Sequence, residues 1–204
     1  MNRYALAISR RALVVGASAS FTAGTLGAQE SAAGKIDSMR GDAFAERASA
    51  RRPLQPAADV FVGDLVETNA GSALSMHLGK ATIVKLGALA KFRIDSFIVD
   101  TGGTLELDQG AMVIDRNDDA KKERLQLRSP FGLIAVRGTL FFAGPSNDVF
   151  GVFVARGAVA VTGGGRTVNL RAGEGTDIAT RGAAPSAPHA WAPDRVAAAF
   201  RTAG

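Results

Sequence analysis

The sequence predicts an all-β domain of many short strands, arranged as a compact β-roll, a β-solenoid or a sandwich, with one short C-terminal helix. Short apolar and β-branched runs recur at intervals of roughly eight to twelve residues. The 24 glycines, together with Asn and Asp, separate these runs. No interior segment keeps the 3.6-residue period of an amphipathic helix for long. At 204 residues, we expect one domain with a single core.

The first 28 residues have the composition of a signal peptide. A basic start precedes a modest apolar stretch that is shorter than the ~20 residues of a membrane-spanning helix. The adjacent Arg10 and Arg11 resemble the twin-arginine export motif. Small residues place the expected cleavage site after Ala28 or Ala33. The sequence therefore predicts a periplasmic or secreted protein that contacts a membrane only during export.

Charge and cysteine content exclude several functions. Three of the 24 basic residues and none of the 19 acidic residues lie in residues 1–28, so the rest of the chain carries a formal charge of +2. The pairs Arg51-Arg52 and Lys121-Lys122 stand in polar stretches that we expect to be loops, so no nucleic-acid partner is predicted. The absence of Cys excludes disulfides, a thiolate nucleophile and a lipoprotein anchor.

The strands are predicted from alternating or continuous apolar runs bounded by turn residues. Polar residues 116–122 are expected to form a surface loop, and the three glycines at 163–165 a hairpin tip. The expected strands cover residues 35–44, 57–61, 65–68, 73–78, 81–86, 90–94, 97–100, 103–107, 111–114, 124–128, 133–142, 149–154, 158–162, 166–170 and 176–178.

The composition changes after this domain, which we expect to cover residues 34–180. Residues 181–204 contain a Pro- and Ala-rich linker, followed by a helix that Asp194 is expected to cap. Such a short helix is unstable alone, so it must pack on the domain or engage a partner. Trp191 and Phe200 are the candidate contacts for a partner, and Trp191 is equally able to attach the tail to the domain.

Five segments occur in the order and spacing typical of one known family. Together they resemble the FecR domain, a periplasmic module of iron-uptake signalling regulators. The resemblance covers about residues 34 to 178 and implies a stand-alone exported module that binds other molecules and has no catalytic residues or cofactor. The segments are Gly34-Lys35-Ile36 with Gly41, Val62-Gly63-Asp64-Leu65-Val66-Glu67-Thr68, Gly71-Ser72-Ala73-Leu74 followed by Gly79-Lys80-Ala81-Thr82-Ile83, Gly110-Ala111-Met112-Val113, and Ser129-Pro130-Phe131-Gly132-Leu133-Ile134-Ala135-Val136-Arg137-Gly138-Thr139-Leu140-Phe141.

The residues of this resemblance are expected to be structural. Arg137 stands in an otherwise apolar run, so its guanidinium must reach water, a carboxylate or a partner. We expect an ion pair, with Asp64 or another carboxylate at a strand end, and keep a ligand role as the alternative. The residues predicted to form the family signature are Gly63, Asp64, Thr68, Arg137, Gly138, Thr139 and Phe141.

No catalytic or metal site is predicted. His77 and His189 are the two histidines and stand far apart in the sequence. We therefore expect a non-catalytic module that senses or scaffolds in envelope or cell-surface signalling, whose partner is an unidentified envelope protein or a polysaccharide. Two alternatives remain: a carbohydrate-active protein using acids such as Glu106 and Asp108, and a structural surface protein that assembles through its sheet edges.

Overall fold

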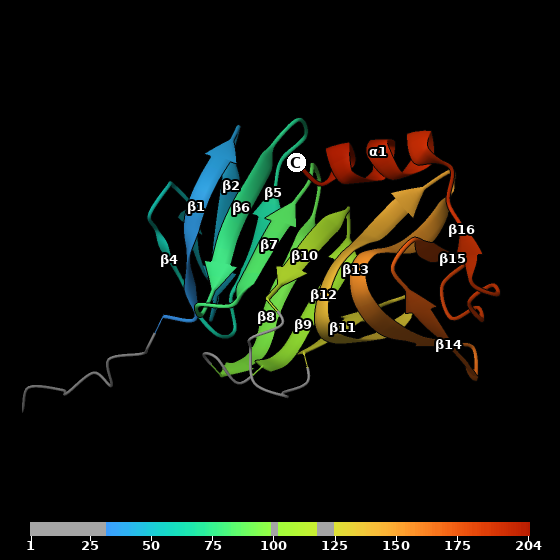
Figure 1. Ribbon diagram of the computed structural model, residues 1–204. Helices are drawn as coiled ribbons and strands as arrows, with labels where there is room; N and C mark the ends of the chain where they lie inside the picture. The colour runs from blue at the N-terminus through green and yellow to red at the C-terminus, as the bar shows by residue number, and fades with distance from the viewer. Residues whose placement is uncertain (1–31, 99–101, 118–124) are drawn as a thin grey trace, which may run out of the picture.

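The structure is a computed structural model, which describes residues 32–98, 102–117 and 125–204. Over these residues the chain forms one curled sheet of 16 strands and a single helix (Figure 1). The predicted all-β class with a short C-terminal helix is confirmed. The predicted signal peptide lies outside the described residues. In chain order the elements are β1 (Gly34–Arg40), β2 (Ala43–Arg47), β3 (Ala50–Pro53), β4 (Asp59–Val60), β5 (Leu65–Thr68), β6 (Ala73–Leu78), β7 (Thr82–Leu86), β8 (Lys91–Ile98), β9 (Gly102–Gln109), β10 (Met112–Arg116), β11 (Leu125–Ser129), β12 (Gly132–Ser146), β13 (Val149–Gly163), β14 (Arg166–Arg171), β15 (Glu174–Ile178), β16 (His189–Ala190) and α1 (Pro193–Thr202).

The curled sheet has two facing layers that share one long hairpin, β12–β13. We call one the open layer: strands β3, β2, β5, β8, β9 and β11, the first part of β12, the second part of β13, and β14. We call the other the covered layer: β4, β1, β6, β7 and β10, the second part of β12, the first part of β13, then β15 and β16. Each layer is therefore continuous in hydrogen bonding with the other through β12 and β13.

The hairpin passes from one layer to the other because β12 and β13 bend at positions that lie side by side. Residues 132–136 of β12 pair with β11, whereas residues 140–143 pair with β10. Between these two stretches the register with β13 shifts, from Arg137 paired with Ala158 to Leu140 paired with Arg156. Such an irregularity bends a strand and increases its twist.

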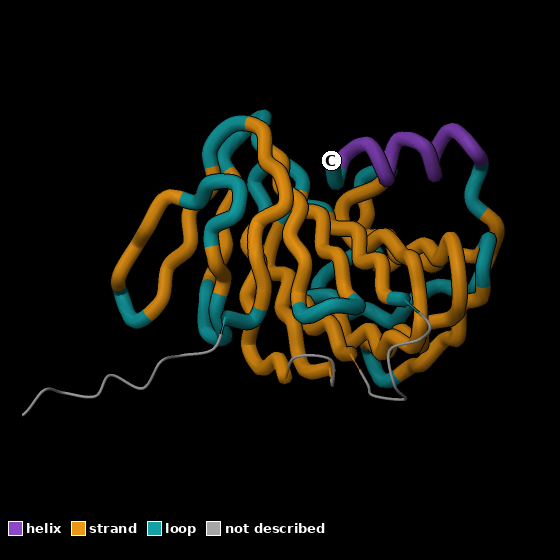
Figure 2. Tube along the Cα trace, turned by 60° about the vertical axis from the view of Figure 1, so that its left-hand side comes forward, coloured by secondary structure: helices purple, strands orange, loops and turns teal. Residues whose placement is uncertain are grey.

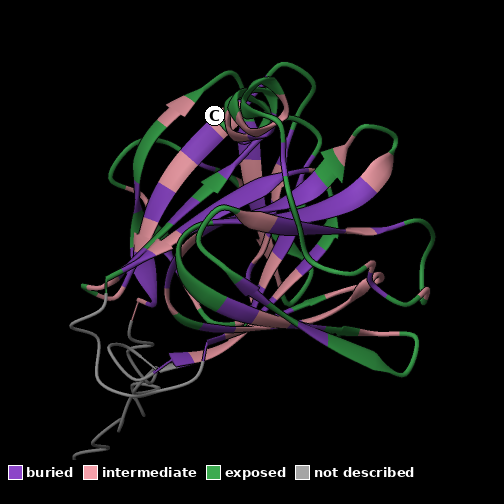
Figure 3. Cartoon of the chain, turned by 45° about the vertical axis from the view of Figure 1, so that its right-hand side comes forward, coloured by how far each residue is buried: buried purple, intermediate pink, exposed green. Residues whose placement is uncertain are grey.

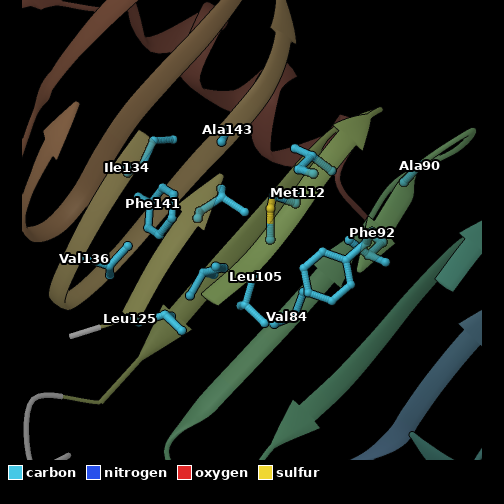
Figure 4. Close-up of a cluster of buried hydrophobic side chains, with 14 of the residues drawn as sticks. Val84, Ala90, Phe92, Leu105, Met112, Leu125, Ile134, Val136, Phe141 and Ala143 are labelled. Carbon is cyan, nitrogen blue, oxygen red and sulfur yellow. The ribbon is translucent and has the colours of Figure 1, made fainter. Parts of the chain in front are cut away.

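The main core lies between the layers and is made by every second residue of most strands. Phe92, Leu105, Met112 and Phe141 are among its largest fully buried side chains. Figure 4 shows these side chains directed toward one another from strands of both layers. The alternation arises because successive side chains of a strand point to opposite faces.

Helix α1 covers the outer face of the covered layer (Figures 1 and 2). A second buried cluster lies beneath it, in which Phe142 and Phe153 of the sheet contact Ala199 and Phe200 of the helix. The sheet is therefore buried on both faces here, which explains the uninterrupted apolar runs of β10, β12 and β13. Figure 3 shows buried, intermediate and exposed residues interspersed along the strands of the sheet.

Several predicted boundaries were wrong. Residues 35–44 form two strands, β1 and β2, because the chain turns at Gly41, whose φ is 71°. Residues 149–162 form the single bent strand β13, since Gly157 bends the strand instead of ending it. Arg51-Arg52 was expected in a loop and lies in β3, and Arg116, expected in the loop 116–122, is the buried last residue of β10.

The C-terminal helix begins earlier than predicted. It starts at Pro193, its N-cap residue is Ala192, and Asp194 lies in the first turn without capping it. Proline suits this position because the first N–H groups of a helix have no partner within the helix. Asp194 still lies at the end where a negative charge is favourable.

Candidate functional site

The bend of the long hairpin is built by the central residues of the family signature. We call Arg137, Gly138 and Thr139 of β12 and Gly157 and Ala158 of β13 the signature corner. Gly138 has φ 56° and Gly157 has φ 80°, both in the left-handed region that glycine favours. A Cβ on Gly157 would lie 2.1 Å from the carbonyl oxygen of Gly138, so the two strands touch through backbone at this point.

Thr139 fastens this corner from the inside. It is fully buried, and its hydroxyl lies 2.9 Å from the carbonyl oxygens of both Arg137 and Ala158. A threonine therefore satisfies carbonyls that the bend takes out of the regular ladder. Phe141, two residues further along, is fully buried in the main core. Both residues point into the interior of the protein, and their structural role stays a prediction.

The predicted ion pair of Arg137 with Asp64 is wrong. Arg137 is exposed and pairs with no carboxylate among the described residues. Its side chain stands on the outer face of the open layer, where water solvates the guanidinium, so the apolar strand around it never buries the charge. Because Arg137 is exposed to solvent, the alternative that it contacts a ligand or a partner stays a prediction.

Asp64 is fully buried and has a different partner. Its carboxylate accepts hydrogen bonds from Arg52 at 2.5 and 3.1 Å and from the backbone N–H of Phe61 at 2.9 Å. The Nε of Arg47 lies 3.7 Å away. Arg52 also donates to the carbonyl of Asp59 at 3.2 Å. Because Arg52 belongs to β3 and Asp59 to β4, the half-buried Arg52 side chain joins an edge strand of each layer.

Gly63 and Thr68 shape the chain on either side of β5. Gly63 has φ 88° and donates its N–H to Ile94 at 2.7 Å. The hydroxyl of Thr68 donates to the carbonyl of Gly87 at 2.6 Å and accepts from the N–H of Ala90 at 2.9 Å. Both residues therefore make hydrogen bonds within turns, and their structural role in the signature stays a prediction.

Trp191 lies on the protein's own sheet, with 7% of its surface exposed. It packs on Phe153 at a ring distance of 5.3 Å and fills the space above two glycines. A Cβ on Gly175 would lie 2.3 Å from its Nε1, and one on Gly151 would lie 2.6 Å from its ring. Of the two roles left open for Trp191, the structure shows attachment of the tail to the domain. Phe200 is half-buried in the same cluster, and its contact with a partner stays a prediction.

Arg195 holds the C-terminal segment, residues 181–204, against the domain. The guanidinium of Arg195 lies 3.6 Å from the centre of the Trp191 ring. It also donates to Asp177 at 2.6 and 3.3 Å and to Ser146 at 3.0 Å. Sequence analysis missed Arg195 and Asp177, because their pairing depends on how the linker returns to the sheet.

Two shallow grooves lie on the surface. The larger, about 330 Å³, is mainly apolar and is lined by the stacked rings of Phe131 and Phe150, with Asp108, Asp148 and Arg181 around it. The smaller, about 260 Å³, lies over β1, β6 and β7 beside Gly204 and includes Arg40 and Lys85. Neither groove contains a residue of the signature corner.

The acids and histidines considered for catalysis lie in ordinary surface positions. Glu106 pairs with Arg93 at 3.7 Å and Arg128 at 3.9 Å, whereas Asp108 lines the larger groove. His77 lies on β6 beside Asp37, and His189 lies on β16, 3.4 Å from Asp177. Within the described residues, no group of three or more His, Cys, Asp or Glu side chains is arranged to hold a metal ion.

Comparison with known proteins identifies the domain. Residues 64–160 match the sequence model of the family described as FecR protein. Over residues 64–160 the chain has a FecR domain. The match includes every predicted signature residue except Gly63, and it ends before the Trp191 tail and α1. No curated protein sequence is significantly similar to the chain.

Two solved structures share the fold of this FecR domain protein. Both are crystal structures of a candidate anti-sigma factor from Parabacteroides distasonis ATCC 8503, at 1.65 and 2.50 Å resolution. Their TM-scores are 0.55 and 0.54, at 20% and 19% sequence identity, and each match covers 66% of this chain. The chain spans 63% and 62% of the length of those two proteins. At this identity, the comparison shows a shared fold.

Proposed function

We propose that this protein is an exported, non-catalytic binding module that senses or scaffolds in envelope or cell-surface signalling. The observation that carries the proposal is the FecR domain, which includes the signature corner and the strands on either side of it. The shared fold of a candidate anti-sigma factor supports the same class of function. Its partner would be an envelope protein or a polysaccharide, met in the periplasm or outside the cell.

The distribution of polar groups supports binding over catalysis. The buried charged and polar groups of the signature, Asp64, Thr68 and Thr139, are occupied by internal hydrogen bonds. They fix the fold and have no free atoms directed at a groove. The described residues also contain no helix that is long and apolar enough to cross a membrane.

The proposed signalling role is tested by removing the gene and measuring transcripts in the native cells. We expect a small, defined set of transcripts to change, and complementation with the full chain to restore it. Arg10→Lys/Arg11→Lys should fail to restore it, because the twin-arginine signal requires both arginines. An unchanged set of transcripts would contradict the signalling role, and full restoration by the lysine variant would contradict export through that signal.

A further inference from the structure

The edges of the curled sheet are not equally protected. Strands β4 and β16 have only two residues each, and β3 ends in a proline, so these edges offer few backbone groups to another strand. Strand β14 (Arg166–Arg171) pairs with β13 alone and is six residues long. Its register with β13 is unbroken, and it contains neither Pro nor Lys. It is therefore the longest strand of the described sheet that is paired on one side only.

The turn that precedes β14 determines which backbone groups point outward. Gly164 and Gly165 have φ 50° and 76°, as in a two-residue type I′ turn, and they join Gly163 to its partner Arg166. The residues that flank such a turn form a hydrogen-bonded pair, and the pairs then alternate along an antiparallel ladder. Thr167 and Asn169 therefore direct both their N–H and C=O groups away from β13.

Two further contacts agree with this alternation. The backbone N–H of Arg171 donates to the carboxylate of Glu174 at 2.9 Å and so is not directed at β13. The hydroxyls of Thr162 and Thr167, a cross-strand pair, lie 2.9 Å apart, as expected where side chains approach closely in a pair without ladder hydrogen bonds. Glu174 protects one end of the edge, and Thr167 and Asn169 remain exposed.

Three arginines lie beside this edge, one end of which also carries the carboxylate of Glu174. Arg137, Ala158 and Arg171 form one row across β12, β13 and β14, so the two arginines stand about 10 Å apart over a small residue. Arg166 lies at the other end of β14. All three arginines are exposed and form no ion pair with the described residues.

The rest of the open layer has the opposite pattern. On β3, β5, β8, β9 and β11, charged side chains on the outer face pair with side chains of opposite charge. The pairs are Arg51 and Lys91 with Glu67, Arg93 with Glu106, and Arg128 with Asp95 and Glu106, at 3.0 to 3.9 Å. Three arginines are thus left without an ion pair beside the longest of the described strands that pair on one side only.

We propose that β14 receives an extended, acidic segment of a partner protein, which adds to the open layer as a further strand. Thr167 and Asn169 supply the backbone hydrogen bonds, while Arg137, Arg166 and Arg171 bind carboxylates of the segment. This inference rests on the proposed function, because it names the surface and the partner chemistry through which the module binds. It also gives the signature residue Arg137 a role that its exposure otherwise leaves without an explanation.

The test uses the full chain, produced and exported in the native cells, with the photo-crosslinking residue benzoylphenylalanine at Thr167. Benzoylphenylalanine at Lys85, on the outer face of the covered layer, is the control position. We expect a crosslink from position 167 that mass spectrometry maps to an acidic segment of another protein, and none to that segment from position 85.

Two further substitutions test separately whether binding depends on the backbone hydrogen bonds of β14 and on its positive charges. Asn169→Pro removes an outward N–H and leaves the ladder with β13 intact, whereas Asn169→Ala keeps that N–H. Arg137→Glu/Arg171→Glu reverses the charge of the row, and Lys85→Glu is the matched reversal elsewhere. We expect Asn169→Pro and the double reversal each to lower the crosslink yield about tenfold, and the two matched controls to leave it unchanged. Thermal unfolding of each purified variant confirms that it is folded.

The other outcomes overturn the proposal in distinguishable ways. A specific crosslink from position 85 alone, with the transcript response intact, would overturn the β14 site and leave the proposed function standing. Crosslinking of position 167 to a second copy of this chain, to a polysaccharide or to a segment without acids would overturn the partner chemistry. No crosslink from either position, together with no transcript response to gene removal, would overturn both the site and the proposed function.

Discussion

The two layers of the sheet share the long β12–β13 hairpin but present very different outer faces. The covered layer places Phe142 and Phe153 outward and buries them under Trp191 and α1. The open layer places charged and small residues outward and leaves them exposed to solvent, with Arg137 among them. The difference teaches that one layer is stabilised on both of its faces, whereas the other keeps one face available for contacts.

The signature residues divide in the same way. Asp64 and Thr139 direct their polar atoms inward and satisfy backbone or arginine groups. Arg137, a neighbour of Thr139 in sequence, directs its charge outward. The signature therefore contains buried residues that stabilise the fold and an exposed residue that is free to make contacts. The burial of each side chain distinguishes the two groups, whereas the sequence pattern does not.

The largest loss of stability is expected where Trp191 covers the outer face of the covered layer. Trp191→Ala removes the ring that fills the space above Gly151 and Gly175, so we expect the free energy of unfolding to fall by about 3 to 5 kcal/mol. Urea unfolding of the chain without its signal peptide measures this. Asn169→Ala on the open layer is the control and should change stability by less than about 0.5 kcal/mol. Equal losses of unfolding free energy for Trp191→Ala and Asn169→Ala would contradict the difference between the two layers.

The next effect concerns the pair of Arg52 and Asp64, in which Arg52 joins an edge strand of each layer. Asp64→Asn removes the buried charge that holds Arg52, and we expect a loss of about 2 to 3 kcal/mol, less than for a fully buried pair because the Arg52 side chain is 34% exposed. Asp59→Asn breaks the exposed pair with Lys35 and should cost less than about 1 kcal/mol. The same urea titration compares them, and a smaller loss for Asp64→Asn than for Asp59→Asn would contradict the structural role of Asp64.

A smaller effect is expected at the bend between the layers. Thr139→Val keeps the shape of the side chain and removes the hydroxyl that reaches two carbonyls, so the expected loss is about 1 to 2 kcal/mol. Thr139→Ser retains the hydroxyl and should be closer to the original protein in its urea midpoint. If the valine variant were the more stable of the two, the hydroxyl would not be what stabilises the corner.

The smallest effect on stability is expected at Arg137. Because its side chain is exposed and unpaired among the described residues, Arg137→Ala should change the free energy of unfolding by less than about 0.5 kcal/mol. Differential scanning calorimetry alongside Thr139→Val checks this. A loss at Arg137 as large as that at Thr139 would show that the whole signature serves the fold.

Sequence pattern predicted strands best where one face is buried. Strands β5 and β6 were predicted with their observed bounds, because their apolar and polar residues alternate. Strand β3 was missed, since its arginines read as a polar loop and their partners, Glu67 and Asp64, are distant in the chain. Strand β13 was predicted as two strands because Gly157, which bends the strand, has the same sequence appearance as a turn glycine.

The roles of the signature residues were predictable only in part. Thr139 and Phe141 lie in an apolar run, and burial of such a run follows from composition alone. The direction of Arg137 and the partner of Asp64 depend on the register of strands far apart in sequence, which no local pattern contains. The single Trp was singled out correctly, but its place on Gly151 and Gly175 required the path of the linker.

The most direct test of the division within the signature is one paired measurement on Arg137→Glu/Arg171→Glu, namely the urea midpoint of the purified protein and the transcript response in complemented cells. We predict an unchanged midpoint together with a lost response, since the open layer would fold normally and fail to bind. A lowered midpoint, or an unchanged midpoint with a full response, would show that Arg137 and Arg171 do not serve binding alone.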